Sequence, residues 1–393
     1  MAEPNSEQIR WNQLRKQHLL DEKDINFFDL IKSQLGLHST DYWTPYFSVY
    51  ARTGNFDAEK MFNSINNGKT LVRTHAFRTT LHVIHVENLS LILSATGPSL
   101  FKVSRTDKFR KMNLLSDKEV EDLLDRVKET LQDGPLQMSE LKRAAPDAEK
   151  HMRSALVMLM ARGEVIRAKA SHARNNLTSY ALMDKWVDGF RMKHLDEEEA
   201  INELIRRHIE LFGPVSIDDI AWWLRVTKTT VKNSIEKISE SVVNIGPQKQ
   251  DRYMMQSDYE IAASLEAPNK DMVWFLPYED HFLKAFIDRT SFITEDIQPY
   301  LFPADRRHFW PSNPDASRVM PSPGLRATGE VRPSIWINGD VIGRWEIDDE
   351  EEQKKIVISI YRKETKDHQE RIEQSRKNLE NFVNDSLQPI SGG

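Results

Sequence analysis

Two segments of the chain show the same order of residue patterns, and this internal repeat limits the possible folds more than any other feature. The first runs from Val120 to Met183 and the second from Ala200 to Met255. Each begins with apolar residues at a helical period, VEDLLDRVKETL in one copy and AINELIRRHIELF in the other. Each of these helices is expected to end at a Gly-Pro pair, because proline cannot continue a helix. The repeat therefore predicts two units built on one plan.

The rest of each copy completes a recognisable order of elements. A short extended piece is followed by a serine, Ser139 or Ser216, ahead of acidic residues, which predicts the cap of a second helix. A third helix follows, HMRSALVMLMARG or TTVKNSIEKI, and an extended arm then ends in a tyrosine strand, SYALM or RYMMQ. Helix, short strand, helix, helix and β-arm is the order of a winged helix. We therefore expect two consecutive winged helices.

The N-terminal segment follows the same plan less regularly. Helical patterns cover INFFDLIKSQL, TPYFSVYAR and AEKMFNSI. The next stretch, KTLVRTHAFRTTLHVIH, is rich in β-branched residues and predicts two wing strands. Residues near 101–112 are expected to form a basic connector. A third winged helix is therefore expected at the N-terminus.

The character of the sequence changes beyond about residue 268. MVWFLPYEDHFLKAFIDR predicts a buried strand with a loop or short helix, and PSIWINGDVIGRWEI predicts a hairpin that turns at Asn338-Gly339-Asp340. VIGRWEI and KKIVISIYR are expected to be consecutive strands, and a charged amphipathic helix is expected from Glu364 to Asp385. Residues 303–333 are rich in Pro, Arg and Ser, which predicts a long exposed loop that contacts DNA.

These patterns predict a mainly helical, α+β fold of tandem winged-helix domains with a small β-rich C-terminal domain. The expected domains are 1–115, 116–190, 191–267 and 268–393. The chain has no cysteine, which excludes disulfides and thiolate chemistry. No signal peptide is recognisable, and no window holds the roughly 18 consecutive apolar residues of a membrane span. We expect a cytoplasmic monomer without membrane contact.

The charge is distributed unevenly along the chain. The net charge is −6, yet residues 50–115 carry ten basic and four acidic side chains, whereas residues 251–300 carry four basic and ten acidic ones. Such asymmetry can give an acidic protein a positive face for DNA, although an ordinary solvated surface is the alternative. The candidate DNA contacts are Arg73, Arg78, Lys102, Arg105, Lys108, Arg110 and Lys111, with Arg306, Arg307, Arg318 and Arg326 in the long loop.

Several strings carry a resemblance that covers nearly the whole chain. HSTDYWTPYFSVYAR, RTTLH and FLPYEDHFLKAFIDR, together with PSIWINGDVIGRW, stand in an order that resembles the AlkZ/YcaQ-type winged-helix DNA glycosylases. The resemblance implies double-stranded DNA as the partner and hydrolysis of an N-glycosyl bond as the reaction. It places catalytic side chains at His38 and Thr40, where the family carries a Gln-x-Gln or Gln-x-Asp pair. Its other motif positions correspond to Thr80, His82, Asp280 and Arg289.

The sequence departs from the family at the candidate catalytic pair. His38 stands where the first glutamine is found, Thr40 takes the second position, and Thr79 replaces a glycine. Excision of an N-alkylated purine needs little acid help, because the leaving base already carries positive charge; the site must stabilise a cationic sugar and direct a water. Neutral His38 can orient water or act as a base, Thr40 can hold the water, and Asp41 can orient the histidine.

Other interpretations of these residues remain open. Ser39, Thr40 and Asp41 precede TPYFSVYAR and are also typical of a helix cap. Four histidines, His38, His75, His82 and His85, suggest zinc only weakly, because His82 and His85 would point to opposite faces of a strand. We expect no metal and no cofactor.

The leading hypothesis is a DNA-repair glycosylase for alkylated or bulky-adduct purines in duplex DNA. The first alternative is a non-enzymatic DNA-binding regulator or lesion sensor that has lost the glutamine pair. A further alternative uses the winged helices for protein contacts only.

Overall fold

The structure is a computed structural model that describes residues 3–20, 25–54, 56–67, 70–173, 178–246, 251–302, 331–348 and 352–391. Its α-helices are α1 (Ser6–Lys16), α2 (Phe27–Ser33), α3 (Thr44–Tyr50), α4 (Ala58–Asn66), α5 (Val86–Arg105), α6 (Asp117–Thr130), α7 (Met138–Ala144), α8 (Met152–Ala161), α9 (Met183–Trp186), α10 (Glu197–Phe212), α11 (Ile217–Leu224), α12 (Lys228–Lys237), α13 (Gln256–Ser264), α14 (His281–Lys284), α15 (Gln298–Leu301), α16 (Lys366–Phe382) and α17 (Gln388–Ile390). Its strands are β1 (Leu37–His38), β2 (Leu71–His75), β3 (Leu81–His85), β4 (Leu136–Gln137), β5 (Val165–Ala170), β6 (Thr178–Leu182), β7 (Val242–Asn244), β8 (Tyr253–Met255), β9 (Val273–Leu276), β10 (Ser334–Ile337), β11 (Asp340–Asp348) and β12 (Lys355–Ile360). The predicted mainly helical α+β class is confirmed.

The largest sheet joins the first two predicted units. Its strand order is β1-β3-β2-β5-β6-β4, and all neighbours are antiparallel. Strands β2 and β3 form the predicted pair, in a register that runs from Leu71 opposite His85 to His75 opposite Leu81. β2 also pairs with β5, where Arg73 lies opposite Arg167. The sequence predicted the wing strands separately but not their union into one sheet.

The second unit has the predicted order α6, β4, α7, α8, β5 and β6. Only the predicted serine cap is wrong, because Ser139 lies inside α7 instead of ahead of it. The helix begins at Met138, and the Glu140 carboxylate accepts a hydrogen bond of 2.7 Å from the backbone N–H of Gln137. The hydrogen bond satisfies the backbone N–H of Gln137, the residue ahead of the first turn. The helix therefore starts before Ser139 and not after it.

The third unit follows the predicted order with α10, α11, α12 and the β7–β8 arm. Ser216 caps α11 as predicted: its hydroxyl accepts from the backbone N–H of Asp219 at 3.1 Å. The Asp219 carboxylate in turn accepts from the backbone N–H of Ser216 at 2.8 Å. These reciprocal bonds satisfy two donors at the helix start, which a serine followed by an acid three residues later is suited to do.

The C-terminal part contains a four-stranded sheet in the order β12-β11-β10-β9. The predicted hairpin is confirmed between β10 and β11, where Asn338 and Gly339 adopt positive φ angles of 50° and 89°. Both residue types tolerate such angles, which two-residue hairpin turns require. The predicted C-terminal helix is also confirmed as α16, which begins at Lys366 and has Thr365 as its cap. Residues 303–330, most of the predicted long loop, lie outside the described residues.

Helix α5 was not predicted, and its last turn corrects the proposed basic connector. The helix continues to Arg105, so residues 101–105 are helical. Pro98 lies inside it and eleven of its residues are buried, a pattern that does not show the one-sided period of a surface helix. A Cβ on Gly97 would lie 2.3 Å from the Ala161 carbonyl oxygen, so glycine permits α5 to pack closely against α8.

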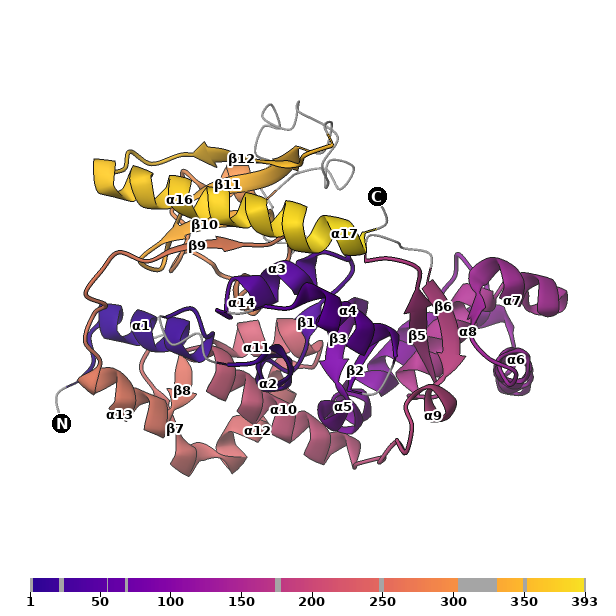
Figure 1. Ribbon diagram of the computed structural model, residues 1–393. Coiled ribbons are helices and arrows are strands. Elements are labelled where there is room, and N and C mark those ends of the chain that lie inside the picture. The colour runs from indigo at the N-terminus through magenta and orange to yellow at the C-terminus, as the bar shows by residue number, and fades with distance from the viewer. Residues whose placement is uncertain are drawn as a thin grey trace.

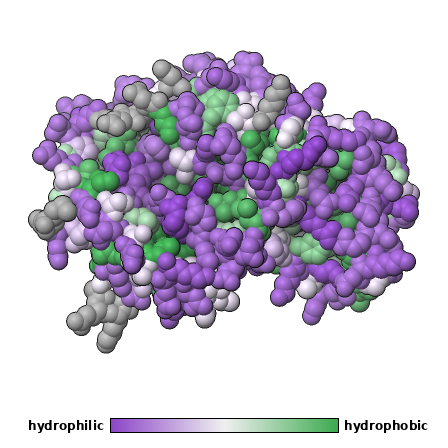
Figure 2. Space-filling view, turned by 90° about the horizontal axis from the view of Figure 1, so that it is seen from below, coloured by the Kyte–Doolittle hydropathy of each residue, from purple (hydrophilic) through white to green (hydrophobic). Residues whose placement is uncertain are grey.

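Figure 1 shows how these parts are arranged. The C-terminal sheet and α16 form the top of the molecule, the third winged helix lies below, and the second winged helix forms one end. One hydrophobic cluster contains residues from α1, α5, the third winged helix and the C-terminal part. The face seen from below is mostly hydrophilic (Figure 2). None of the helices in the described ranges combines the length and apolar character that crossing a bilayer requires.

Candidate active site

The residues of the predicted catalytic motif begin on the short edge strand β1. Its partner β3 places His38 directly opposite His82, and the backbone N–H of Ser39 donates to the Leu81 carbonyl at 2.7 Å. His38 and His82 are both buried, with ring centroids 5.6 Å apart in an edge-to-face arrangement. The neighbouring Leu81 instead lines a surface groove. The alternation of β3 therefore sends His82 inward and Leu81 toward the groove.

His38 belongs to a buried cluster with Glu279 and Lys284, two residues that follow β9. The His38 Nε2 atom lies 3.9 Å from a carboxylate oxygen of Glu279, and the same oxygen is ion-paired with Lys284. The other Glu279 oxygen accepts from the backbone N–H of Val331 at 2.7 Å. A paired charge with a further hydrogen bond is the form in which proteins tolerate buried ions.

The environment keeps His38 uncharged at neutral pH. Burial, and next the positive charge of Lys284, lower the pKa of the imidazole well below its usual value. The Nδ1 atom of His38 is buried and lacks a hydrogen-bond partner among the described residues. The imidazole is thus a neutral side chain with one unsatisfied nitrogen, set below the surface and not in open contact with solvent.

Arg73, predicted to contact DNA, serves the motif from inside the protein. It is 3% exposed, and its Nε donates to the Ser39 hydroxyl at 2.7 Å while Nη2 donates to the Ser39 carbonyl. Its guanidinium lies 3.6 Å from the centroid of the Tyr42 ring. Burial lowers the pKa of Arg73 to about 10. Its burial contradicts the prediction that it neutralises a phosphate, and its Nε and Nη2 hold Ser39 instead.

Asp41 holds the turn that leads into helix α3, whose N-cap residue is Trp43. Its Oδ1 accepts from the backbone N–H groups of Trp43 and Thr44 at 3.0 and 3.1 Å, which is close to the capping role left open by the sequence. Burial raises the pKa of Asp41, against the opposing effect of these hydrogen bonds. Its described contacts do not include His38, the partner that the sequence suggested. Trp43 and Tyr46, which follow Asp41, are buried in a hydrophobic cluster.

Thr40 is the exposed member of the motif. It lines a groove of about 920 Å³ between the first and second units. The groove receives basic side chains from the loop after α5, from α7, from α8 and from β5, and none of its described lining residues is a carboxylate. Its polar lining consists of Thr40, His75, Thr79, Ser104, Arg110, Gln137, Ser139, Lys142, Arg153, Arg167, Thr178 and Tyr180. A concave surface of this composition attracts a polyanion.

His75 contributes a neutral imidazole to the groove. Its Nδ1 lies 2.9 Å from the Thr79 carbonyl oxygen. Because a carbonyl only accepts, Nδ1 carries the proton and Nε2 is left as an acceptor. Burial lowers the pKa of His75 to about 4, although the bond to Thr79 opposes this. The sequence singled out His75 only for a metal site. Among the described residues, no group of three or more His, Asp and Glu side chains is placed to bind a metal ion.

The other family-motif positions have structural contacts. Asp280 is buried and forms a two-point ion pair with Arg52, at 2.7 and 2.8 Å. Burial alone would raise the pKa of Asp280, but Arg52 lowers it to about 2. The Thr80 hydroxyl donates to the Phe77 carbonyl at 3.0 Å, and Arg289 is buried and donates to the Leu283 carbonyl at 2.9 Å. None of these three residues lines the groove.

The remaining predicted DNA contacts differ in their surroundings. Lys102, Lys108 and Lys111 are exposed, as a phosphate contact requires. Arg105 instead donates to the carbonyls of Met112 and Leu115 and holds the following loop. The guanidinium of Arg78 lies 3.7 Å from the centroid of the Trp222 ring. Arg110 lines the groove. The other four, Arg306, Arg307, Arg318 and Arg326, lie outside the described residues.

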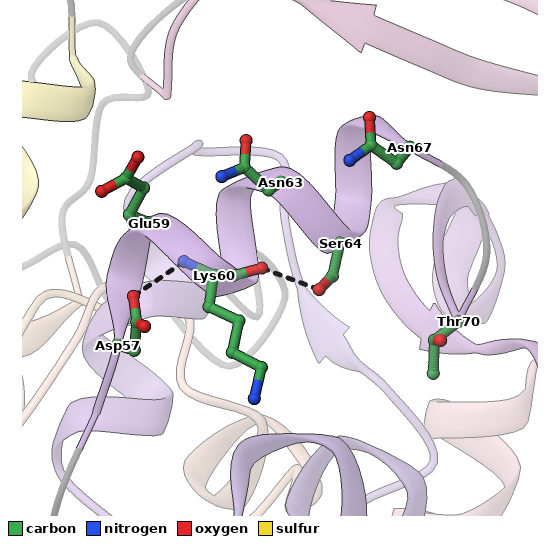
Figure 3. Close-up of a pocket in the computed structure, with 7 residues that line it drawn as sticks. All are labelled: Asp57, Glu59, Lys60, Asn63, Ser64, Asn67 and Thr70. Atoms are coloured by element: carbon green, nitrogen blue, oxygen red, sulfur yellow. Dashed lines mark hydrogen bonds between the residues drawn. The ribbon is translucent and has the colours of Figure 1, made fainter.

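A second hollow of about 420 Å³ follows α4 and differs from the groove (Figure 3). Asp57, Glu59 and Lys60 give it both signs of charge. Its two drawn hydrogen bonds, from the Lys60 backbone to Asp57 and from Ser64 to the Lys60 carbonyl, belong to the helix itself. Both hydrogen bonds join groups of α4 and its cap residue Asp57, and they provide no donors for an anion.

Tandem winged helices beside a basic groove define a class, the winged-helix DNA-binding proteins. The chain belongs to the DNA glycosylase AlkZ-like family, whose model matches residues 31–382. It is therefore a DNA glycosylase, a hydrolase of N-glycosyl bonds, and the non-enzymatic alternatives are not favoured. The fold is similar to that of Streptomyces sahachiroi DNA glycosylase AlkZ, with a TM-score of 0.75, 16% identity, and coverage of 99% of this chain and 98% of that one. No curated protein sequence matches the chain significantly.

Several participants in the site were missed by sequence reasoning, including the groove-lining Lys142 and Arg153. Glu279 and Lys284 lie more than 200 positions after His38, and only the fold brings them together. Arg167 reaches the groove because β5 pairs with β2, a contact between separate units. A polar residue inside an otherwise apolar segment was the available signal for Glu279 and Lys284, since ions are seldom buried without a partner.

Proposed function

We propose that this glycosylase hydrolyses the N-glycosidic bond of alkylated or bulky-adduct purines in duplex DNA. The single observation that carries the proposal is the groove, in which basic and uncharged polar side chains surround Thr40 without a carboxylate among the lining residues. Arg110, Lys142, Arg153 and Arg167 would neutralise phosphates along it. The reacting sugar would then lie against Thr40.

A groove whose described lining offers no carboxylic acid is compatible with a leaving base that is already cationic. An N-alkylated purine departs without protonation, so a strong general acid is not required. The remaining need is to orient a water toward the anomeric carbon and to stabilise the positive sugar. Uncharged oxygen and nitrogen acceptors can orient the water, while the phosphates of the DNA provide negative charge close to the sugar.

Thr40 and His75 are the groove-lining residues that can share the water. The Thr40 hydroxyl both donates and accepts, and the neutral His75 ring offers Nε2 as an acceptor because Thr79 binds the proton on Nδ1. His38 and Asp41 have a different part in the proposal. His38 is a buried residue of β1 that lies opposite His82 in β3, and Asp41 fixes the turn into α3. Both residues therefore position Thr40, which lies between them in the sequence.

The decisive assay uses duplex DNA with one N7-methylguanine and measures the free base released under single-turnover conditions. We expect release from this duplex and none from an unmodified duplex of the same sequence. A larger N7 adduct in the same position tests whether the open groove accepts bulk. Failure to release any N7-alkylated purine, although the protein binds the duplex, would contradict the proposed substrate class.

Two substitutions at Thr40 test whether the rate of base release depends on its hydroxyl group or only on its volume. Thr40→Val keeps the volume and removes the hydroxyl, and we expect roughly tenfold slower base release, below the ~10²–10⁴-fold of a positioned base because water can partly replace a hydroxyl. Thr40→Ser retains the hydroxyl and serves as the matched control. Equal rates for both variants would exclude a role for the hydroxyl.

The histidines and Asp41 are distinguished by what each substitution preserves. His75→Phe should slow release while His75→Gln restores part of the rate, since glutamine again offers an acceptor.

His38→Gln restores the residue expected from the family resemblance and should retain release, whereas His38→Ala should slow it. Asp41→Asn keeps the capping oxygen and should therefore leave more activity than Asp41→Ala. A full rate for Asp41→Ala would show that the cap is dispensable.

The pH dependence of base release gives an independent test of His75. Its pKa of about 4 means that Nε2 remains an acceptor throughout the neutral range and is lost only when the pH falls through about 4. The rate should therefore be flat between pH 8 and pH 6, in contrast to a histidine base of ordinary pKa. A decline centred near pH 6.5 that disappears in His75→Gln would contradict the neutral, buried state assigned here.

A further inference from the structure

The loop between α5 and α6 presents a phenylalanine to solvent. Phe109 is 100% exposed, the highest value among the large apolar side chains that the structure describes. Burial of such a ring is worth about 2 kcal/mol, so a folded protein gains nothing from displaying it. Single exposed apolar residues are common, but a fully exposed ring on a braced loop needs a further explanation.

Hydrogen bonds hold this loop in one shape. The Asp107 carboxylate accepts from the backbone N–H groups of Phe109 and Arg110 at 2.9 and 3.1 Å, and its other oxygen accepts from the Arg110 side chain at 2.9 Å. The Met112 N–H donates to the Asp107 carbonyl at 3.0 Å. The Arg105 side chain holds the end of the loop, because it donates to the carbonyls of Met112 and Leu115. The ring therefore projects from a fixed base, so little conformational entropy is lost when a ligand covers it.

The surroundings of Phe109 identify the chemistry of a ligand. Lys108 precedes it and Lys111 follows it in the sequence, both exposed, and Arg110 lines the groove that also contains Thr40. Val103, 42% exposed on the last turn of α5, also lines the groove. An aromatic ring flanked by cations at the rim of a basic groove matches a nucleic acid, which offers phosphates and base faces together.

We propose that Phe109 inserts into the bound duplex and stacks on a base, next to the segment that lies in the groove. This inference rests on the proposed function, because it takes the duplex to follow the groove past both Thr40 and Arg110. Lys108 and Lys111 then bind the phosphates on either side of the inserted ring. The local unstacking loosens the helix near the reacting nucleotide, and the side chain is a positioning residue without contact to the broken bond.

The test uses an unmodified duplex that carries 2-aminopurine, whose fluorescence rises when its stacking is disturbed. Binding of the parent protein should raise the fluorescence at one position of a series in which the reporter is moved along the duplex. Phe109→Ala should abolish this rise and weaken binding by roughly tenfold, the effect expected for one aromatic stack. Phe109→Trp keeps a stacking ring and should retain both. The slope of affinity against salt should stay unchanged in Phe109→Ala, because no phosphate contact is lost.

Two control variants separate stacking from charge and from general apolar exposure. Lys108→Glu should reduce the salt slope while the fluorescence change persists at saturating protein. Ile261, 40% exposed on α13 at the other end of the molecule (Figure 1), provides the matched apolar control, and Ile261→Ala should change neither readout. Melting of Phe109→Ala should match that of the parent, since the removed ring makes no buried contact.

The possible outcomes distinguish this inference from the proposed function. If Phe109→Ala keeps the parent's affinity and fluorescence change, the insertion is wrong even when methylguanine is released. If the parent shows the Phe109-dependent change but releases no alkylated base, the insertion stands and the proposed substrate class fails. Phe109-dependent binding to vesicles of anionic phospholipid, without a fluorescence change on DNA, would assign the ring to a membrane and overturn the inference.

Discussion

The buried histidine of the third winged helix allows a quantitative test of the structure. His208 on α10 is 0% exposed, lies between Phe212 and Trp223 with ring centroids 4.8 Å from each, and has no hydrogen-bond partner for either ring nitrogen among the described residues. Burial alone lowers the pKa of His208 to about 3. Its only cause of a shifted pKa is therefore desolvation, which makes it a cleaner probe than His38 or His82.

The sign and size of the effect follow from proton linkage. Below the ordinary pKa of 6.5 the unfolded chain binds a proton at this histidine and the folded chain does not, so stability falls as the pH falls from 6.5 toward 3. Between pH 7 and pH 5 this lowers the free energy of unfolding by about 2 kcal/mol. The value at pH 5 hardly depends on whether the folded pKa is 2, 3 or 4, because the folded state is unprotonated in each case.

The assay is urea unfolding of the parent and of His208→Leu at pH 7 and at pH 5. The parent should lose about 2 kcal/mol more than the variant over this interval, whatever their difference at pH 7. His194→Leu is the control, because His194 is exposed and its replacement leaves the buried group in place. Equal pH dependence of the parent and His208→Leu would show that the imidazole is not buried in neutral form, and the desolvation argument would fail.

Three further outcomes are expected. Arg52→Leu should destabilise the fold by about 3–5 kcal/mol in urea unfolding, because it leaves Asp280 as a buried, unpaired charge; a loss below 1 kcal/mol would contradict the buried pair. Gly97→Ala should lower the melting temperature, since its Cβ would meet the Ala161 carbonyl at 2.3 Å, and an unchanged melting temperature would exclude this close packing. Lys108→Glu should weaken duplex binding across sequences and flatten its salt dependence, whereas equal binding at every salt concentration would remove this lysine from the interface.

The elements that the sequence predicted well are those whose signals are local. The Gly213-Pro214 stop, the Ser216 cap and the Asn338-Gly339 turn each depend on neighbouring residues, and the structure has them at the expected places. The other stop is less exact, because α6 already ends at Thr130, ahead of Gly134. Helix α5 was missed because it is buried on several sides and contains Pro98, so neither a one-sided apolar period nor a clean stop marks it. The serine cap at Ser139 failed because Glu140 satisfies an earlier backbone group.

The candidate site was predictable as a segment but not as a set of contacts. The motif residues were found by resemblance, yet their partners Glu279 and Lys284 come from a distant part of the chain. Counting basic residues identified a basic region but could not separate Lys108, which is exposed, from Arg73, which is 3% exposed. Lys108 and Arg73 carry the same unit charge, and only the neighbouring residues decide whether that charge meets solvent or holds the backbone.

The contacts of Arg73 explain how two motif residues come to lie in different environments. Residues two apart in a strand face the same side, yet His38 is buried with Glu279 while Thr40 is exposed in the groove. The strand β1 ends at His38, and the capping bonds of Asp41 already turn the chain into α3. Between them, Arg73 binds both the hydroxyl and the carbonyl of Ser39 and so fixes the bend. The buried arginine therefore holds the backbone next to Thr40, and these contacts do not involve DNA.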